Sequence, residues 1–244
     1  MMGDILLQIP GVLEVWGDQP KEFSGEVCTD TRLLTQGQAY LALNGEQHRG
    51  VTFAEKALEA GAPLIIAEAL EREKESLEKL HKKFPHATFL IVENANKYFQ
   101  NMAQLWAKRW RERDPRRFLI GLTGSNGKTT TKEILKYLLE ALYPARVLAT
   151  EGNLNNQFGV PMTLLRLDDD VDVGVIEMGT SGPGEIELLA KIAKAEAGLI
   201  TNIGPAHLEF LGNLEGVFHE KIGLYKIFAS TENKKSFCIN SKDH

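Results

Sequence analysis

The sequence predicts an α/β protein with two domains, residues 1–95 and 96–244, of which the second contains a mostly parallel sheet. Two observations support this fold class. Short apolar runs alternate with helical patterns along most of the chain, which is the order expected of β-α units. A long amphipathic helical pattern begins at residue 96 and separates two sets of such runs. A length of 244 residues is sufficient for both domains.

The first domain is predicted from strand-like runs at 39–43, 63–67 and 88–92, with helical patterns at 53–58 and 70–84 between them. The long helical pattern that follows covers 96–113. Its apolar stripe consists of Phe99, Met102, Ala103, Trp106 and Trp110. Asp114-Pro115 ends this helix, because the residue before a proline disfavours the helical conformation. Since the helix has an apolar face to bury, we expect it to lead into the second domain rather than to act as a flexible linker.

The second domain has five strand candidates, at 118–123, 146–150, 173–178, 198–203 and 236–240. Helical patterns lie between most of them, which predicts a parallel sheet with helices on both faces. Ligands of such sheets bind at the carboxyl ends of the strands. The candidate functional residues of this domain all follow a predicted strand, so we expect them to meet at one edge of the sheet.

The composition is that of an ordinary globular protein, with 43% apolar and 25% charged residues. A formal charge of −5 offers no basic field to nucleic acid, so no such partner is expected. Cys28 and Cys238 lie far apart in the sequence, which favours a reducing compartment over a disulfide framework. Neither a signal peptide nor a run of about 20 apolar residues is visible. We therefore expect a cytoplasmic protein without a membrane span.

A glycine-rich turn, Gly124 to Thr129, joins the run 118–123 to a helical pattern that begins near Lys128. Glycines let the backbone approach a polyphosphate closely, and a helix N-terminus favours anions. Lys128 is placed to reach the β and γ phosphates, and Thr129 to offer its hydroxyl to Mg²⁺. Leu122 stands where the strict P-loop pattern has its first glycine. The turn still predicts nucleotide binding; the alternative is a strand-to-helix turn without a ligand.

Two other strand ends carry candidate metal ligands. Glu177 ends the run 173–178, and carboxylate oxygen is a preferred ligand of Mg²⁺. His207 follows the run 198–203, although imidazole is not a preferred ligand of this ion. A solvated or helix-capping glutamate and a structural histidine are the alternative interpretations.

Lys221 lies within a helical pattern that runs from residue 214 to 228. It falls near the middle of an apolar face formed by Leu214, Val217, Phe218, Leu224, Tyr225 and Phe228. A lysine in such a place must pair, reach solvent or lose its charge. A neutral amine reacts with carbon dioxide to give a carbamate, which is an anionic oxygen ligand. From the pattern alone, reaching solvent or pairing with Glu220 or Glu185 is favoured.

Several stretches, taken in order, resemble the Mur ligase family, whose members add amino acids to the peptidoglycan precursor. In the second domain they are 123–133 (TGSNGKTTTKE), 153–161 (NLNNQFGVP), 177–186 (EMGTSGPGEI) and 201–209 (TNIGPAHLE). In the first domain, 30–32 (DTR) and 42–46 (ALNGE) look like the UDP-sugar-binding segment of the family. The resemblance spans nearly the whole chain.

The resemblance implies an ATP-dependent, amide-forming ligase. The implied reaction joins D-alanyl-D-alanine to UDP-N-acetylmuramoyl-tripeptide through an acyl phosphate, and the enzyme is expected to be a monomer. Residues 1–95 would bind the UDP-muramoyl substrate, and 96–244 would form the central ATP-binding domain. The residues implied to bind ATP are Thr123, Gly124, Ser125, Asn126, Gly127, Lys128, Thr129 and Thr130.

The same resemblance implies roles for the strand-end residues. Thr129 and Glu177 would bind one Mg²⁺, and His207 with a carbamylated Lys221 would bind a second. The implied catalytic residues are Lys128, Glu177, His207 and Lys221. The implied substrate-binding residues are Thr31, Arg32, Asn155, Asn156 and Thr180.

The sequence departs from the family in two respects. The family has Asp-Gly-His after its Gly-Glu segment, whereas this chain has Arg49-Gly50-Val51. Family members also continue into a third, C-terminal domain, which we expect to be absent here. The alternatives are therefore a folylpolyglutamate-type ligase, a nucleotide-binding fragment that is inactive without a third domain, and a general P-loop ATPase.

Overall fold

The computed structural model describes residues 6, 8–18, 20, 23–24, 26–45, 48–142, 146–230 and 235–240, apart from the side chains of Arg72 and Leu142. The chain divides into two compact units, Met1–Met102 (unit 1) and Ala103–His244 (unit 2). The division lies inside α4 (Ala95–Glu112), whereas the boundary expected from the sequence lies at the beginning of that helix.

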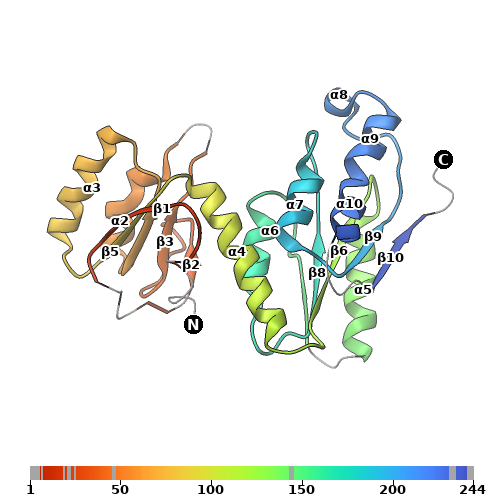
Figure 1. Cartoon of the computed structure of the whole chain (residues 1–244), viewed down its shortest axis with the longest axis horizontal. Helices are drawn as coiled ribbons and strands as arrows, with labels where there is room; N and C mark the ends of the chain where they lie inside the picture. The colour runs from red at the N-terminus through yellow and green to blue at the C-terminus, as the bar shows by residue number, and fades with distance from the viewer. Residues whose placement is uncertain are drawn as a thin grey trace. The chain divides into compact units, whose positions relative to one another are not determined.

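Unit 1 contains a five-stranded sheet in the order β1-β5-β4-β3-β2. The central strands β3 (Ala39–Ala42), β4 (Leu64–Ala67) and β5 (Thr88–Val92) are parallel and completely buried, as their apolar runs predict. The helices η1 (Gly50–Phe53), α2 (Ala54–Glu59) and α3 (Glu71–Lys83) follow β3 and β4. Helices α2 and α3 pack on one face of the sheet, where Ala54, Ala57, Leu58 and Leu77 complete an apolar core (Figure 1).

Two strands of unit 1 were not predicted. β1 (Val12–Trp16) pairs antiparallel with β5, and β2 (Val27–Cys28) pairs parallel with β3. In β1, Leu13 and Val15 are 61% and 45% exposed, so the residues that point to solvent are apolar and the usual alternation is lost. β2 has two residues, which is too short to produce a pattern.

Unit 2 contains the predicted parallel sheet, in the order β10-β9-β6-β8-β7. All five strand candidates are confirmed, within three residues at each end. The strands are β6 (Phe118–Thr123), β7 (Val147–Ala149), β8 (Val173–Glu177), β9 (Ala197–Ile200) and β10 (Ser236–Ile239). Because β6 lies between β8 and β9, the chain crosses over β6 after β8, and this reversal of strand order is where parallel sheets bind ligands.

Helices cover both faces of this sheet, as predicted. α5 (Lys128–Leu142) packs on one face against β6, β7 and β8. α6 (Gly159–Leu165), α7 (Glu185–Ala193) and α10 (Gly223–Ser230) pack on the other (Figure 1). The core on that side joins Trp110 of α4 to Leu119, Leu164, Ile176, Leu189 and Leu224.

The single helix expected from 214 to 228 is wrong in part. The chain forms α9 (Leu214–Lys221), turns at Ile222 and continues as α10, after the short α8 (Leu208–Leu211). The expected apolar face is therefore not continuous. Val217 and Leu224 are buried, but Leu214, Phe218 and Tyr225 are exposed. The buried residues Val217, Glu220, Lys221 and Leu224 keep the helical spacing across Ile222, whereas the three exposed residues lie to one side of that face.

We expect Trp110→Ala to lower the free energy of unfolding of unit 2 by about 3–5 kcal/mol, as is usual when a buried aromatic side chain is removed. Trp110 is 1% exposed, and its indole Nε1 donates to the carbonyl of Asp168 at 2.9 Å. Urea unfolding followed by circular dichroism measures the change. The control is Tyr137→Ala, at a side chain that is 74% exposed, where the change should stay within about 0.5 kcal/mol. Equal losses in both variants would contradict the assignment of the core.

Candidate active site

The glycine-rich turn leaves the end of β6 with backbone conformations that require glycine. Gly124 has φ +152°, and a Cβ at this position would overlap the hydroxyl of Thr201. Gly127 has φ +75°. The turn rests on the segment that follows β9, since the amides of Ser125 and Asn126 donate to Asn202 at 3.1 and 2.9 Å.

Beyond these two engaged amides, the N-terminus of α5 provides further donors. Thr131 is the first residue whose amide bonds back into the turn, to the carbonyl of Gly127 at 2.9 Å. The amides of the first helical turn, Lys128 to Thr130, therefore have no acceptor within the helix. Such a group of N–H donors, together with the helix dipole, suits an anion. Thr123 differs from the rest of the turn, because it is fully buried and its hydroxyl donates to the carbonyl of Met178.

Lys128 folds back over the turn. Its Nζ donates to the carbonyls of Gly124 and Ser125, at 2.9 and 3.4 Å. Burial lowers the pKa of Lys128, and the charge of Glu177 opposes this shift. The ammonium group of Lys128 therefore lies against the glycine-rich turn and is only partly solvated.

Glu177 is 1% exposed, and its two carboxylate oxygens differ. Oε1 accepts from Nδ2 of Asn155 at 2.9 Å and from the hydroxyl of Thr129 at 3.4 Å. Oε2 accepts no hydrogen bond from any residue that the structure describes, although Nζ of Lys132 lies 4.0 Å away. A buried carboxylate oxygen without a donor is costly and suits a bound cation. Together with the threonine hydroxyl it forms a set of hard oxygen donors that fits Mg²⁺.

Lys132 was not singled out by the sequence analysis. Its side chain is 2% exposed, and Nζ donates to the carbonyl of Thr150 at 2.7 Å. It follows Lys128 by four residues, so both lie on the same side of α5. That spacing is the signal that would have identified it.

Lys221 is 1% exposed, so the structure excludes the expectation that it reaches solvent. Burial, together with the smaller effect of the charge of Lys128, lowers the pKa of Lys221 to about 8, and the charges of Glu220 and Glu185 oppose the shift. Within the described part of the chain, no hydrogen bond or ion pair joins Lys221 to either glutamate. The amine is therefore buried with only long-range compensation.

Glu220 is a second buried charge that the sequence analysis did not assign to the site. Its carboxylate accepts from the amides of Gly184 and Ile186 at 2.6 and 2.8 Å, which places an acid at the N-terminus of α7. Because Glu220 precedes Lys221 on α9, this contact ties Lys221 to the segment 180–184 that follows β8.

The structure shows no hydrogen bond or ion pair between His207 and the other expected site residues that it describes. His207 is exposed, has φ +52°, and precedes α8. Among the residues described, its ring makes no hydrogen bond or ion pair, and no group of three or more His, Cys, Asp or Glu side chains is arranged to hold a metal.

The expected substrate-binding residues fall into two places. In unit 2, Asn155 contacts Glu177, and Asn156 accepts from the amide of Gly159 at 2.9 Å. Thr180 is buried, and its hydroxyl donates to the carbonyl of Gly182 at 2.6 Å. In unit 1, Thr31 is half-buried, and Arg32 is exposed and paired with Asp30.

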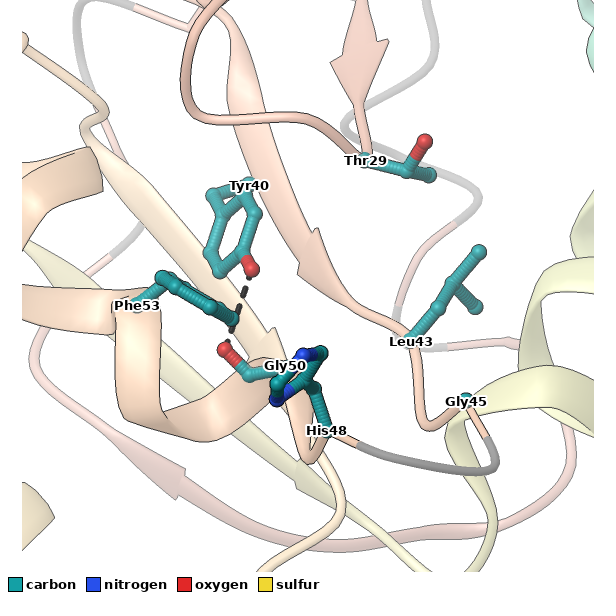
Figure 2. Close-up of a pocket in the computed structure, with 7 residues that line it drawn as sticks. All are labelled: Thr29, Tyr40, Leu43, Gly45, His48, Gly50 and Phe53. Atoms are coloured by element: carbon teal, nitrogen blue, oxygen red, sulfur yellow. Dashed lines mark hydrogen bonds between the residues drawn. The ribbon is translucent and has the colours of Figure 1, made fainter.

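Unit 1 also contains a cavity of about 430 Å³ at the end of β3 (Figure 2). The described residues that line it are Thr29, Tyr40, Leu43, Gly45, His48, Gly50 and Phe53. The hydroxyl of Tyr40 donates to the carbonyl of Gly50 at 3.0 Å and fixes one wall. Arg49, which replaces an aspartate of the expected motif, pairs with Glu73 at 2.6 Å. Its charge is thereby compensated outside the set of residues that line the cavity.

Comparison with known proteins agrees with this geometry. A model of the Mur ligase middle domain matches residues 122–244. The UDP-N-acetylmuramoyl-tripeptide–D-alanyl-D-alanine ligase of Synechocystis is 42% identical over 77% of this chain and 38% of its own length. The ligase of the same name from Bacillus subtilis is 37% identical over 80% of this chain and 39% of its own length. The chain thus spans about two fifths of the length of these relatives.

Solved structures give the same result. MurF from Acinetobacter baumannii aligns with a TM-score of 0.76 and 29% identity, over 95% of this chain and 50% of that one. The MurF ligase from Thermotoga maritima in complex with ADP aligns with a TM-score of 0.71 and 28% identity, over 88% and 45%. The family model covers half of the chain and begins inside β6, just before the glycine-rich turn, and we conclude that the chain belongs to the Mur ligase family.

Proposed function

We propose that the protein acts in the ATP-dependent ligation of D-alanyl-D-alanine to UDP-N-acetylmuramoyl-tripeptide during peptidoglycan precursor synthesis. The observation that carries the proposal is made at the edge of the unit 2 sheet. There the glycine-rich turn and Lys128 lie near the buried carboxylate of Glu177, one oxygen of which accepts no hydrogen bond from the described residues. The names of two similar relatives supply the substrates. An ADP complex of a structural relative supports the nucleotide.

In this proposal the γ-phosphoryl group of ATP moves to the terminal carboxylate of the tripeptide and forms an acyl phosphate. The amine of D-alanyl-D-alanine then attacks the acyl carbon, an amide forms and phosphate leaves. Lys128 and the free amides of residues 128–130 would bind the polyphosphate and stabilise the negative charge of the transferring group. Ser125, Asn126 and Thr130 would contribute to the walls of the ATP site, and Thr123 to its support.

Thr129 and Glu177 would hold one Mg²⁺, which supplies charge neutralisation to the phosphates when it is bound. The unpartnered Oε2 atom of Glu177 and the adjacent hydroxyl support this assignment. We propose His207 and a carbamylated Lys221 for a second ion. The buried amine of Lys221, which pairs with neither Glu185 nor Glu220, supports the carbamate, because its neutral form can attack carbon dioxide and release a proton.

Substrate-binding residues are proposed in each of the two units. The unit 1 cavity beside Tyr40 and His48 offers aromatic walls and backbone groups suited to the UDP part, with Thr31 and Arg32 contributing nearby in the sequence. Asn155, Asn156 and Thr180 are proposed to contact the muramoyl part in unit 2.

We propose a cytoplasmic monomer. The described part of the chain has no helix long and apolar enough to cross a membrane. Cys28 and Cys238 are free thiols, which agrees with a reducing compartment.

The activity test is formation of UDP-N-acetylmuramoyl-pentapeptide and release of phosphate when ATP, Mg²⁺, the tripeptide and D-alanyl-D-alanine are supplied together. Lys128→Ala should abolish both products and weaken ATP binding about 10- to 100-fold, since a charge-assisted hydrogen bond contributes about 1.5–3 kcal/mol. Isothermal titration calorimetry measures the affinity. Lys136→Ala on the same helix, where Lys136 pairs with Glu140 at the surface, is the matched control.

Three outcomes would replace the proposed reaction with another. Phosphate release without the tripeptide indicates a general ATPase. Ligation of a folate substrate indicates the folylpolyglutamate type. Binding of ATP without turnover of any substrate indicates a nucleotide-binding module.

The burial of Lys221 makes stability depend on pH. Its folded pKa of about 8 lies below the ordinary value of 10.5, so the unfolded state binds more protons between these values. Below pH 8 the folded protein bears the full free-energy cost of burying the ammonium charge. The free energy of unfolding therefore rises as the pH increases from about 8 to 10.5. Lys221→Met should therefore raise the free energy of unfolding at pH 7 by roughly 3 kcal/mol and remove this rise. Urea unfolding in buffer free of carbon dioxide measures both effects.

The same variant tests the carbamate. With ¹³C-bicarbonate present, the wild-type protein should show a carbamate carbon signal in its NMR spectrum, and Lys221→Met should lack it. A signal of equal strength in both proteins would assign the carbamate to another amine and overturn the role of Lys221.

A further inference from the structure

Lys132 is a buried cation that the proposed chemistry does not use. It lies on α5 with 2% of its side chain exposed, although lysine is rarely buried to this degree without a specific partner. Nζ donates to the carbonyl of Thr150 at 2.7 Å and pairs with the exposed Glu133 at 3.0 Å. The third group near it is Oε2 of Glu177, at 4.0 Å.

Thr150 connects Lys132 to Glu177 by a second route. The hydroxyl of Thr150 accepts from the amide of Glu177 at 2.9 Å, and the amide of Thr150 donates to Val175 at 3.0 Å. Lys132 therefore anchors the residue that follows β7, and that residue fixes the last residue of β8. The path joins α5 to the ends of two strands and terminates at the carboxylate of Glu177.

The distance of 4.0 Å between Nζ and Oε2 is too long for a hydrogen bond but short enough for strong electrostatic attraction. The ammonium draws the carboxylate toward it, yet it donates to Thr150 and leaves the lone pairs of Oε2 unoccupied. Asn155 and Thr129 engage the other oxygen. Three side chains thus fix the orientation of the carboxylate, while Oε2 remains free to bind a cation.

We propose that Lys132 is a positioning residue that orients Glu177 so that Oε2 is presented to the divalent cation of a bound nucleotide. The inference rests on the proposed function, because it assumes that unit 2 binds ADP or ATP with Mg²⁺. It adds a specific claim: Lys132 strengthens the thermodynamic coupling between Mg²⁺ and the nucleotide rather than the affinity for the nucleotide itself. Residues behind a metal ligand commonly change metal affinity by about 10- to 100-fold.

The test is calorimetric titration of the full chain with ADP, once with Mg²⁺ and once with EDTA. Lys132→Met should weaken ADP binding about tenfold with Mg²⁺ and less than about twofold in EDTA. Lys132→Arg should restore most of the Mg²⁺-dependent affinity, because it keeps a charged donor. Lys136→Met, at the surface pair with Glu140, should behave as wild type.

A purely structural role predicts a different pattern. If Lys132 only supports the fold, Lys132→Met lowers stability and affects both titrations equally, or neither, and the proposal is overturned. Circular dichroism verifies folding before titration. Should the methionine variant not fold, Lys132→Gln replaces it, since glutamine keeps a donor for Thr150 without the charge, and the same two outcomes apply. If wild-type protein binds no ADP under either condition, the proposed function itself has failed.

Discussion

The buried carboxylate of Glu177 is the group around which the rest of the site is arranged. An ionised side chain with 1% exposure is tolerated only where donors and charges compensate it. Asn155, Thr129 and Lys132 provide that compensation from three different segments, after β7, at the start of α5 and one turn later. One oxygen is nevertheless left without a donor. The fold thus stabilises the carboxylate only partly, and the proposed cation site depends on the remaining deficit.

The cations around this carboxylate outnumber it. Lys128 and Lys132 are at least half-buried near Glu177, whose charge acts on Lys128 and whose Oε2 lies 4.0 Å from Nζ of Lys132. A region with two partly desolvated ammonium groups favours a polyanion, which agrees with a polyphosphate ligand although the whole chain is acidic.

Much of this arrangement could be predicted from the sequence, because buried parallel strands are continuous apolar runs. The five strands of unit 2 and the position of the glycine turn follow from that rule. β1 could not be predicted, since the apolar side chains of Leu13 and Val15 face solvent and the strand lacks the usual alternation of apolar and polar residues. The period of 3.6 placed Lys221 on an apolar face but favoured its reaching solvent or pairing with a glutamate, so its burial without such a pair was not predicted.

The charged contacts were less predictable. Lys132 lies in the polar run 129–133, which looks like a solvated helix start, and only its spacing from Lys128 distinguishes it. The hydrogen-bond partners of Glu220 lie more than thirty residues away in the sequence, and no local sequence pattern indicates such a contact. His207 follows a strand end as predicted, but it is exposed and has a left-handed backbone conformation, which the sequence did not indicate.

The bridge from Glu220 to the start of α7 has a mechanical consequence. Glu220 accepts hydrogen bonds from the amides of Gly184 and Ile186, and the next residue along its helix is Lys221. Two hydrogen bonds therefore join the start of α7 to the helix that carries Lys221. A ligand that displaced the loop after β8 would have to break these bonds or shift Lys221 with it.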